Sequence, residues 1–289
     1  MGAALRVARL DTSLEGLDPE RLLRRVFAIV SFLAWLATPA LAAPPDTVFL
    51  EELTWPELRA LIDGGKTTII LPIGGTEQNG PHMALGKHNV RVRALSARIA
   101  RELGNALVGP VMAYVPEGGI SPPTGHMRFP GTITVPDDVF RRSLESAVRS
   151  VRLHGFRDVV LLGDHGSTQA GEKAVATRLN REWTSTPVRV HAIDAYYQAA
   201  TAGFRDVLRA RGYRPDELGE HAALPDTALT LAIDPGMVRT DAPSDARVPG
   251  AGTGVDGDPR RASAELGRIG IDLIIERTVA AIRRSITQR

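Results

Sequence analysis

The sequence predicts an α/β fold of three layers, in which helices cover both faces of a mostly parallel central sheet. Two observations predict it. Apolar runs of strand length alternate with longer segments that carry apolar residues at helical spacing. Polar, glycine-rich stretches follow two of the apolar runs, as is typical of the carboxyl edge of a parallel sheet. No internal repeat or linker interrupts residues 43–289, so we expect one domain there.

Four apolar runs predict the strands of this sheet. "TTIILPIGG" is β-branched and is stopped by two glycines, and "RDVVLLGDHG" is an apolar run with a polar end. With the two remaining runs, the expected strands are residues 67–75, 106–115, 157–166 and 188–197.

Four segments with helical spacing predict the main helices: residues 90–104, a helix that starts at Asp137, residues 169–183 and residues 262–286. Gly104 ends the first of them, and Asp137 can cap the second. A long loop, "SPPTGHMRFPGTITV", precedes Asp137. The glycine-rich residues 250–260 are interpreted as a tight loop, because no strand precedes them and no lysine follows at phosphate-loop spacing.

The first 42 residues form an N-terminal extension followed by a predicted secretory signal. Two arginines precede a short apolar run that ends in Ala40-Leu41-Ala42, which is the pattern of a signal cleaved after Ala42. We therefore expect an exported, periplasmic or secreted protein with no stable membrane span after cleavage. An uncleaved anchor and a buried helix are the alternatives.

Composition narrows the classes of function. The chain has 35 basic and 33 acidic residues without a basic stripe, so nucleic acid is not an expected partner. It has no cysteine, which excludes disulfides, thiolate zinc sites and a cysteine nucleophile. Any metal must be held by His, Asp, Glu or amide oxygens, and these ligands favour Zn, Mn or Fe in a hydrolytic site.

Polar side chains gather after the first and third predicted strands, in "GGTEQNGPH" and "GDHGSTQ". Both segments should reach the same edge of a parallel sheet. Glu77, His88 and His165 can then serve as ligands of a divalent ion, with Asp164 as a further ligand or as the residue that orients one. For any single loop histidine, the alternative is a solvated or hydrogen-bonded side chain. Asp226, in the third polar cluster, could equally be an ordinary helix cap.

Five blocks of sequence then suggest a family. They are "LPIGGTEQNGPHMALGKHN", "FPGTITV", "LLGDHGSTQ", "GEHAALPDTALTLAIDP" and "GVDGDPRRASAELG". In these blocks, and in their order, the chain resembles the creatininase family of metal-dependent amidohydrolases. The resemblance implies a creatininase-like α/β/α fold for residues 43–289, a homo-oligomer that is often a hexamer, and one or two divalent ions.

The resemblance also assigns residues. Glu77 and His165 match two of the family's metal ligands, and His82 matches the second histidine of the first block. His221 matches a histidine that some members use for proton transfer. Asn79 stands where the family has its first ligand histidine.

Three further positions depart from the pattern. His88 stands in place of the bridging aspartate, Asp226 in place of a late glutamate, and Asp164 in place of a glycine. An imidazole nitrogen offers its lone pair to one metal only, so His88 cannot bridge two ions as an aspartate can, and a standard two-metal centre is less favoured. His88 does, however, restore the imidazole that is lost at Asn79. The predicted set is as follows: metal ligands Glu77, His88, His165 and Asp226; catalytic residues His221 and, less favoured, His82; supporting or substrate-contacting residues Asn79, Asp164, His126 and Ser167.

The predicted function is that of an exported amidohydrolase, which uses metal-activated water to cleave a C–N bond of a small cyclic amide or a related molecule. The alternative is a non-catalytic protein of the same fold that binds a small molecule or acts as a scaffold. A nucleotide-binding module is a third class, and the lack of a phosphate loop argues against it.

Overall fold

The structure, a computed structural model, describes residues 44–240 and 252–288. The predicted signal and its cleavage site lie outside the described residues. Among the helices that are described, none is both long and apolar enough to cross a membrane.

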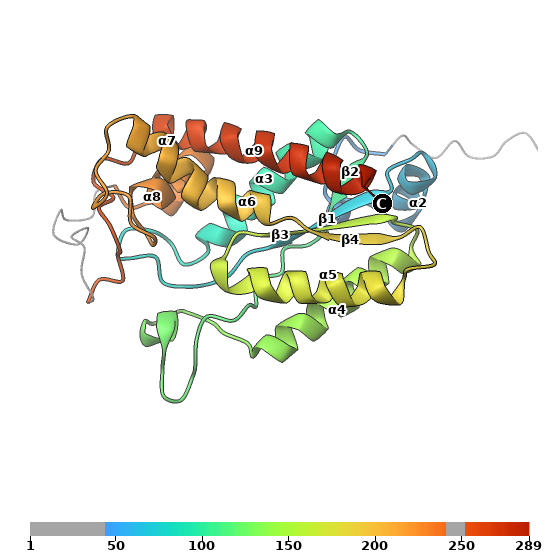
Figure 1. The fold of residues 1–289 in the computed structure, drawn as a ribbon, viewed down its shortest axis with the longest axis horizontal. Helices are drawn as coiled ribbons and strands as arrows, with labels where there is room; N and C mark the ends of the chain where they lie inside the picture. The colour runs from blue at the N-terminus through green and yellow to red at the C-terminus, as the bar shows by residue number, and fades with distance from the viewer. Residues whose placement is uncertain (1–43, 241–251, 289) are drawn as a thin grey trace, which may run out of the picture. The chain divides into compact units, whose positions relative to one another are not determined.

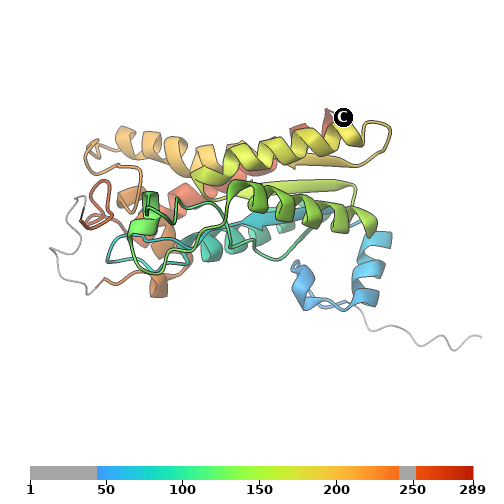
Figure 2. The same ribbon diagram turned by 90° about the horizontal axis from the view of Figure 1, so that it is seen from below.

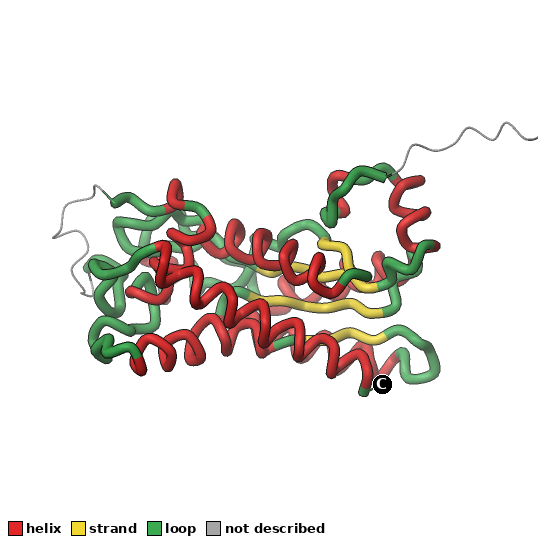
Figure 3. The backbone as a smooth tube through the Cα atoms, turned by 90° about the horizontal axis from the view of Figure 1, so that it is seen from above, coloured by secondary structure: helices red, strands yellow, loops and turns green. Residues whose placement is uncertain are grey.

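The sheet has four strands in the order β2-β1-β3-β4, and every neighbouring pair is parallel. Figure 3 draws the strands in yellow among the red helices. The strands are β1 (Thr68–Ile73), β2 (Ala106–Val108), β3 (Asp158–Gly163) and β4 (Arg189–Ala192). β1 pairs with β3 along its whole length, and all residues of both strands are buried. The predicted parallel sheet is therefore confirmed.

Helices cover both faces of this sheet, so the expected three layers are confirmed. The helices described are α2 (Trp55–Asp63), α3 (Lys87–Leu103), α4 (Asp137–Leu153), α5 (Gln169–Glu182), α6 (Asp194–Gln198), α7 (Phe204–Ala210), α8 (Leu224–Ile233) and α9 (Ala264–Thr287), and a π-helical turn, Ala199–Gly203, joins α6 to α7. Figure 1 shows α3, α6 and α9 on one side of the sheet and α4 and α5 on the other. Figure 2 shows the second of these faces, with α4 and α5 lying across it.

The core is divided by the alternation of side chains along the strands. Ile70 and Val160 point to one face and pack with the apolar residues of α3, α8 and α9. Ile69 and Val159 point to the other face and pack with those of α4 and α5. Both faces are buried, which explains why the strands read as continuous apolar runs without polar alternation.

Two predicted strands are too long. β2 ends at Val108 because Gly109 and Pro110 follow, and proline has no N–H to donate to the ladder. Met112 and Val115 form only isolated bridges beyond it.

β4 ends at Ala192, and α6 begins two residues later at Asp194, so "DAYY" is helical. The predicted helix cap Asp137 is wrong as well, and so is the helix cap that was the alternative interpretation of Asp226. Asp137 and Asp226 both lie inside the first turn of their helices, after Pro136 and Ala223 respectively.

The topology fixes where a ligand can bind. From β1 the chain crosses to β2 on one side and then returns to β3 on the other side of β1. The segments that follow β1 and β3 therefore leave the sheet next to each other, at the point where the strand order reverses. Glu77 lies in the first of these segments and His165 in the second.

Candidate functional site

The loop after β1 is held against the start of α3. Asn89 Oδ1 accepts a hydrogen bond from the Gly75 N–H at 3.0 Å, and Asn89 Nδ2 donates to Thr76 Oγ1 at 3.2 Å. Residue 74 must be glycine for this approach, because a Cβ there would lie 2.1 Å from Asn89 Oδ1. These contacts set the position of Glu77.

Glu77 is completely buried and lies among four histidines. Its Oε1 is 2.8 Å from His88 Nε2 and 3.7 Å from His221 Nδ1. Its Oε2 is 2.8 Å from His165 Nε2 and 3.1 Å from His126 Nε2. Burial alone would raise the pKa of Glu77, but hydrogen bonds from His165 and His88 hold it well below its usual value. The carboxylate is therefore ionised.

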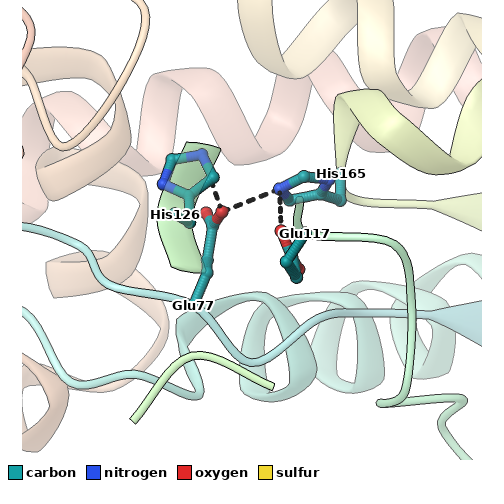
Figure 4. Close-up of side chains that lie close together, drawn as sticks. All are labelled: Glu77, Glu117, His126 and His165. Atoms are coloured by element: carbon teal, nitrogen blue, oxygen red, sulfur yellow. Dashed lines mark hydrogen bonds and ion pairs between the residues drawn. The ribbon is translucent and has the colours of Figure 1, made fainter. Parts of the chain in front are cut away.

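Glu117 supplies a second buried carboxylate at the same place (Figure 4). Its Oε2 lies 3.1 Å from His165 Nε2, yet neither of its oxygens accepts a well-aligned hydrogen bond from the described residues. Burial raises the pKa of Glu117, more than its contact with His165 lowers it. A buried carboxylate in this position lacks a strong partner, and a metal ion is the kind of cation that would complete it.

His165 is shared between the two carboxylates. One imidazole N–H makes one good hydrogen bond, but Nε2 faces oxygens of both Glu77 and Glu117. Burial lowers the pKa of His165, but these two carboxylates outweigh it and raise the pKa to about 10. On its other side, Nδ1 accepts a hydrogen bond from the Ser167 backbone N–H at 3.1 Å and lies 2.6 Å from Ser167 Oγ.

Glu77, Glu117, His126 and His165 together fit a divalent ion. Each offers one ligand atom, and the four atoms all lie within 4.8 Å of one another. Carboxylate oxygens and imidazole nitrogens are the ligands that zinc and manganese accept. Glu117 was not predicted, although it follows β2 and so reaches the same edge of the sheet.

Hydrogen bonds distinguish His126 from His88. Gln78 Nε2 donates to His126 Nδ1 at 3.0 Å, and its amide orientation is fixed because Oε1 accepts from the Gly80 N–H and Nε2 also donates to Gly254 O. A neutral His126 therefore carries its proton on Nε2, the nitrogen that faces Glu77.

His88 has the opposite arrangement. Its Nδ1 lies 2.6 Å from a carboxylate oxygen of Asp164, which is itself held by Arg91 and by the Tyr196 hydroxyl at 2.7 Å. Nδ1–H donates to this carboxylate, and Nε2 lies 2.8 Å from Glu77 Oε1, where its lone pair would be available to an ion bound at Glu77. The predicted role of Asp164, to orient a ligand, fits this contact.

Asp226 and Asn79 are turned to other partners. Asp226 Oδ1 accepts from Arg91 Nη1 at 2.6 Å, and Oδ2 accepts from Lys87 Nζ. Asn79 Nδ2 donates to the backbone carbonyls of Glu77, at 2.9 Å, and Ala84, at 3.1 Å. The cluster of metal-capable atoms therefore forms without either residue.

The two predicted catalytic histidines lie in different surroundings. His221 Nε2 donates to the backbone carbonyl of Gln78 at 2.9 Å, so the lone pair of Nδ1 faces Glu77. Burial, the largest cause, lowers the pKa of His221 to about 4, which keeps the ring neutral near pH 7. His82 is buried beside Thr227, with Nε2 3.0 Å from its hydroxyl, and is not part of the cavity wall.

A cavity of about 270 Å³ opens onto these groups. Glu77, His88, His126, His165 and His221 all line it, as does Lys87. This volume is just below the roughly 300 Å³ at which ligand pockets begin, so the cavity suits only a small molecule.

Comparison with known proteins agrees with the fold. Residues 51–282 match the family described as Creatininase, Creatinine amidohydrolase. The chain is 26% identical over 256 residues to the creatinine amidohydrolase of Pseudomonas putida, covering 82% of this chain and 96% of the relative. It is also 27% identical over 247 residues to the mycofactocin precursor peptide peptidase of Mycobacterium tuberculosis, covering 76% and 86%.

Solved structures give the same result. A creatininase structure labelled Mn superposes with a TM-score of 0.66 and 26% identity, covering 83% of this chain and 99% of that one. A creatininase mutant labelled Zn-Zn type gives 0.63 and 25%, covering 83% and 98%. The family match covers most of the chain and the fold agrees over the same range: the chain belongs to the creatininase family.

Proposed function

We propose that this protein is a metal-dependent hydrolase that cleaves a C–N bond of a small molecule bound in the cavity beside Glu77. The observation that carries the proposal is the convergence of two buried carboxylates, Glu77 and Glu117, on one nitrogen of His165. Family membership supports the reaction class, because an amidohydrolase and a peptidase, both cleaving C–N bonds, are among the relatives.

Glu77, Glu117 and His165 are the ligands that we propose for a zinc, manganese or iron ion. The fourth place is open to His126, whose Nε2 is within reach of the other ligand atoms, or to His88. The hydrogen bonds favour His88, because its second nitrogen donates to a carboxylate, whereas the second nitrogen of His126 accepts from an amide.

A divalent ion held there would supply a positive charge that polarises a carbonyl group and acidifies water. His221 is placed to move the proton. Its neutral ring presents the lone pair of Nδ1 toward Glu77, so it can accept a proton from the attacking water and return it to the leaving nitrogen. The backbone carbonyl of Gln78 holds the ring in this tautomer.

A non-catalytic binding or scaffold protein is the alternative. It is favoured by the changes at Asn79 and Asp226, which turn away from the cluster of metal-capable atoms. Turnover separates the two candidates.

The test is hydrolysis by the chain loaded in turn with zinc, manganese and iron. The substrates are creatinine, other small cyclic amides and short peptides. We expect turnover of at least one of them, and its loss in the variants Glu77→Gln and His165→Ala but not in Glu276→Gln, an exposed residue of α9. Metal binding without turnover of any substrate would favour the binding protein, and full activity of either site variant would refute the assignment.

Export and assembly are further parts of the proposal. The N-terminal pattern supports cleavage after Ala42 and a periplasmic or secreted location. The family resemblance supports a homo-oligomer, such as a hexamer. N-terminal sequencing of the mature protein and light scattering after size-exclusion chromatography test these two points.

A further inference from the structure

Lys87 is a buried ammonium group in the wall of the cavity. It is the first residue of α3 and is 1% exposed. Its Nζ donates to Asp226 Oδ2 and lies 4.0 Å from Glu77 Oε1, which is too far for a hydrogen bond. An ammonium group has three N–H donors, and Asp226 is its one hydrogen-bond acceptor in the part of the chain that the structure describes. Donors therefore remain for a molecule in the cavity.

The charges around Lys87 divide into two groups. Arg91 donates to both Asp164 and Asp226, and Lys87 donates to Asp226. These two carboxylates and two cations form a network with no net charge. Buried charges are tolerated when they are paired in this way.

Two buried carboxylates near Lys87 lie outside this network, namely Glu77 and Glu117. Metal ligands bind in their deprotonated forms, so with an ion in place the histidines are neutral and the two carboxylates carry a charge of −2, which equals the magnitude of the charge of one divalent ion. A second divalent ion would find no further buried and unpaired carboxylate in the described cavity wall, because Asp226 is bound to Lys87 and Arg91. Glu220, which also lines the cavity, is 79% exposed and lies 3.5 Å from Arg205. Asn79, turned to backbone carbonyls, offers a second ion no ligand.

We infer that this centre takes a single divalent ion, and that Lys87 is the fixed second positive charge beside it. The inference rests on the proposed function, since it assumes that Glu77 and its neighbours hold an ion. Lys87 Nζ lies 4.0 Å from Oε1 of Glu77, a proposed ligand of the ion, so both positive charges would be near enough to act on one oxygen of a bound substrate. The substrate is then a small molecule whose carbonyl oxygen becomes negative during C–N cleavage, and Lys87 donates a hydrogen bond to that oxygen.

The test uses the full-length chain stripped of metal. This protein is titrated with Zn²⁺ in a calorimeter, and the bound ions are counted by mass spectrometry. We expect one ion per chain in the unaltered protein. Lys87→Met should bind Zn²⁺ at least tenfold more tightly, because the repulsion between the ammonium group and the ion is removed. Lys87→Arg should bind as the unaltered protein does, and so should Lys173→Met, which changes an exposed lysine of α5.

The outcomes separate this inference from the proposed function. Two ions per chain in the unaltered protein would overturn the single-ion centre and leave the hydrolase proposal standing. One ion per chain with the same affinity in Lys87→Met would overturn the role of Lys87. No bound ion in the unaltered protein would overturn the proposed function itself. The number of ions bound by the unaltered protein tests both the single-ion centre and the proposed function, even if Lys87→Met does not fold.

Discussion

At the scale of single residues, the buried carboxyl groups differ in what faces them. Burial raises the pKa of Asp164 and Asp226, but Arg91 beside Asp164 and Lys87 beside Asp226 outweigh it, and both pKa values fall below the usual range. Glu172, on α5, has no such cation: burial raises its pKa to about 7, although the Thr168 hydroxyl and the backbone of Gly163 oppose this.

Glu172 makes stability depend on pH. Its folded pKa, about 7, is above its unfolded value of 4.5, so its contribution to stability is complete below pH 4.5 and is lost as the pH rises through 7. Between pH 5 and 8 the free energy of unfolding should fall by about 2.5 kcal/mol more in the unaltered protein than in Glu172→Gln. Urea unfolding at the two pH values measures this difference. The exposed control Glu276→Gln should behave as the unaltered protein, and an equal loss in Glu172→Gln would refute the prediction.

The two candidates for the fourth ligand can be compared directly. If His88 is the ligand, His88→Ala should weaken zinc binding by at least a factor on the order of 10–100, the range found when residues that only orient a metal ligand are lost. His126→Ala should have the smaller effect, because its second nitrogen accepts from Gln78. Calorimetric titration of both variants decides the matter, and the reverse order of affinities would assign the ligand role to His126.

Some of these residues can be read from the sequence and some cannot. Glu77 and His165 were predicted because each follows a strand that ends at the same edge. The partners of Asp226 could not be predicted, since they depend on how α3 packs against α8. An aspartate in the first turn of a helix reads as a cap whether or not a lysine and an arginine reach it.

At the scale of elements, the position of Asp226 depends on how closely α8 and α9 approach. A Cβ on Gly267 of α9 would lie 1.9 Å from the carbonyl oxygen of Ala228 and 2.7 Å from the Cβ of Ala232, both on α8. Gly270, one turn further on, would meet Leu229 Cδ2 at 2.8 Å. Glycine at these positions lets the two helices pack backbone to side chain.

Gly267→Ala should therefore destabilise the protein. In an open helix interior this change stabilises by roughly 1 kcal/mol, but here the backbone of α8 must move, and overpacking costs about 1–3 kcal/mol. Thermal unfolding measures the change, with Arg268→Ala, an exposed neighbour, as the control. A melting temperature equal to or above that of the unaltered protein would contradict the close packing.

The long elements were predictable and the short ones were not. α3, α4, α5 and α9 have enough turns for their periodicity to be clear. The run that ends β4 and begins α6 is apolar throughout, and periodicity does not separate a strand from a buried helix over so few residues. Tyr196, in that run, is fully buried and its hydroxyl donates to Asp164, a contact that no local pattern reveals.

At the scale of the whole molecule, the sheet order places the site. The edge at which the polar segments meet follows from parallel strands alone, but the order β2-β1-β3-β4 depends on pairings between distant residues. This order puts the loops after β1 and β3 side by side, and the segment after β2 brings Glu117 to them.

An ion bound between these segments should stabilise the fold as a whole. At a free ion concentration one hundred times the dissociation constant, the expected gain is about 2.7 kcal/mol. Chelation should therefore lower the melting temperature of the unaltered protein and leave that of Glu77→Gln unchanged. If the chelator shifts both proteins equally, its effect does not come from this site.

Anomalous X-ray diffraction from crystals loaded with zinc shows whether Glu77, Glu117 and His165 hold a divalent ion. We expect one zinc peak per chain, at roughly 2.0–2.2 Å from a carboxylate oxygen of Glu77 and from Nε2 of His165. A peak elsewhere, or no peak at this cluster from crystals saturated with zinc, would contradict this assignment.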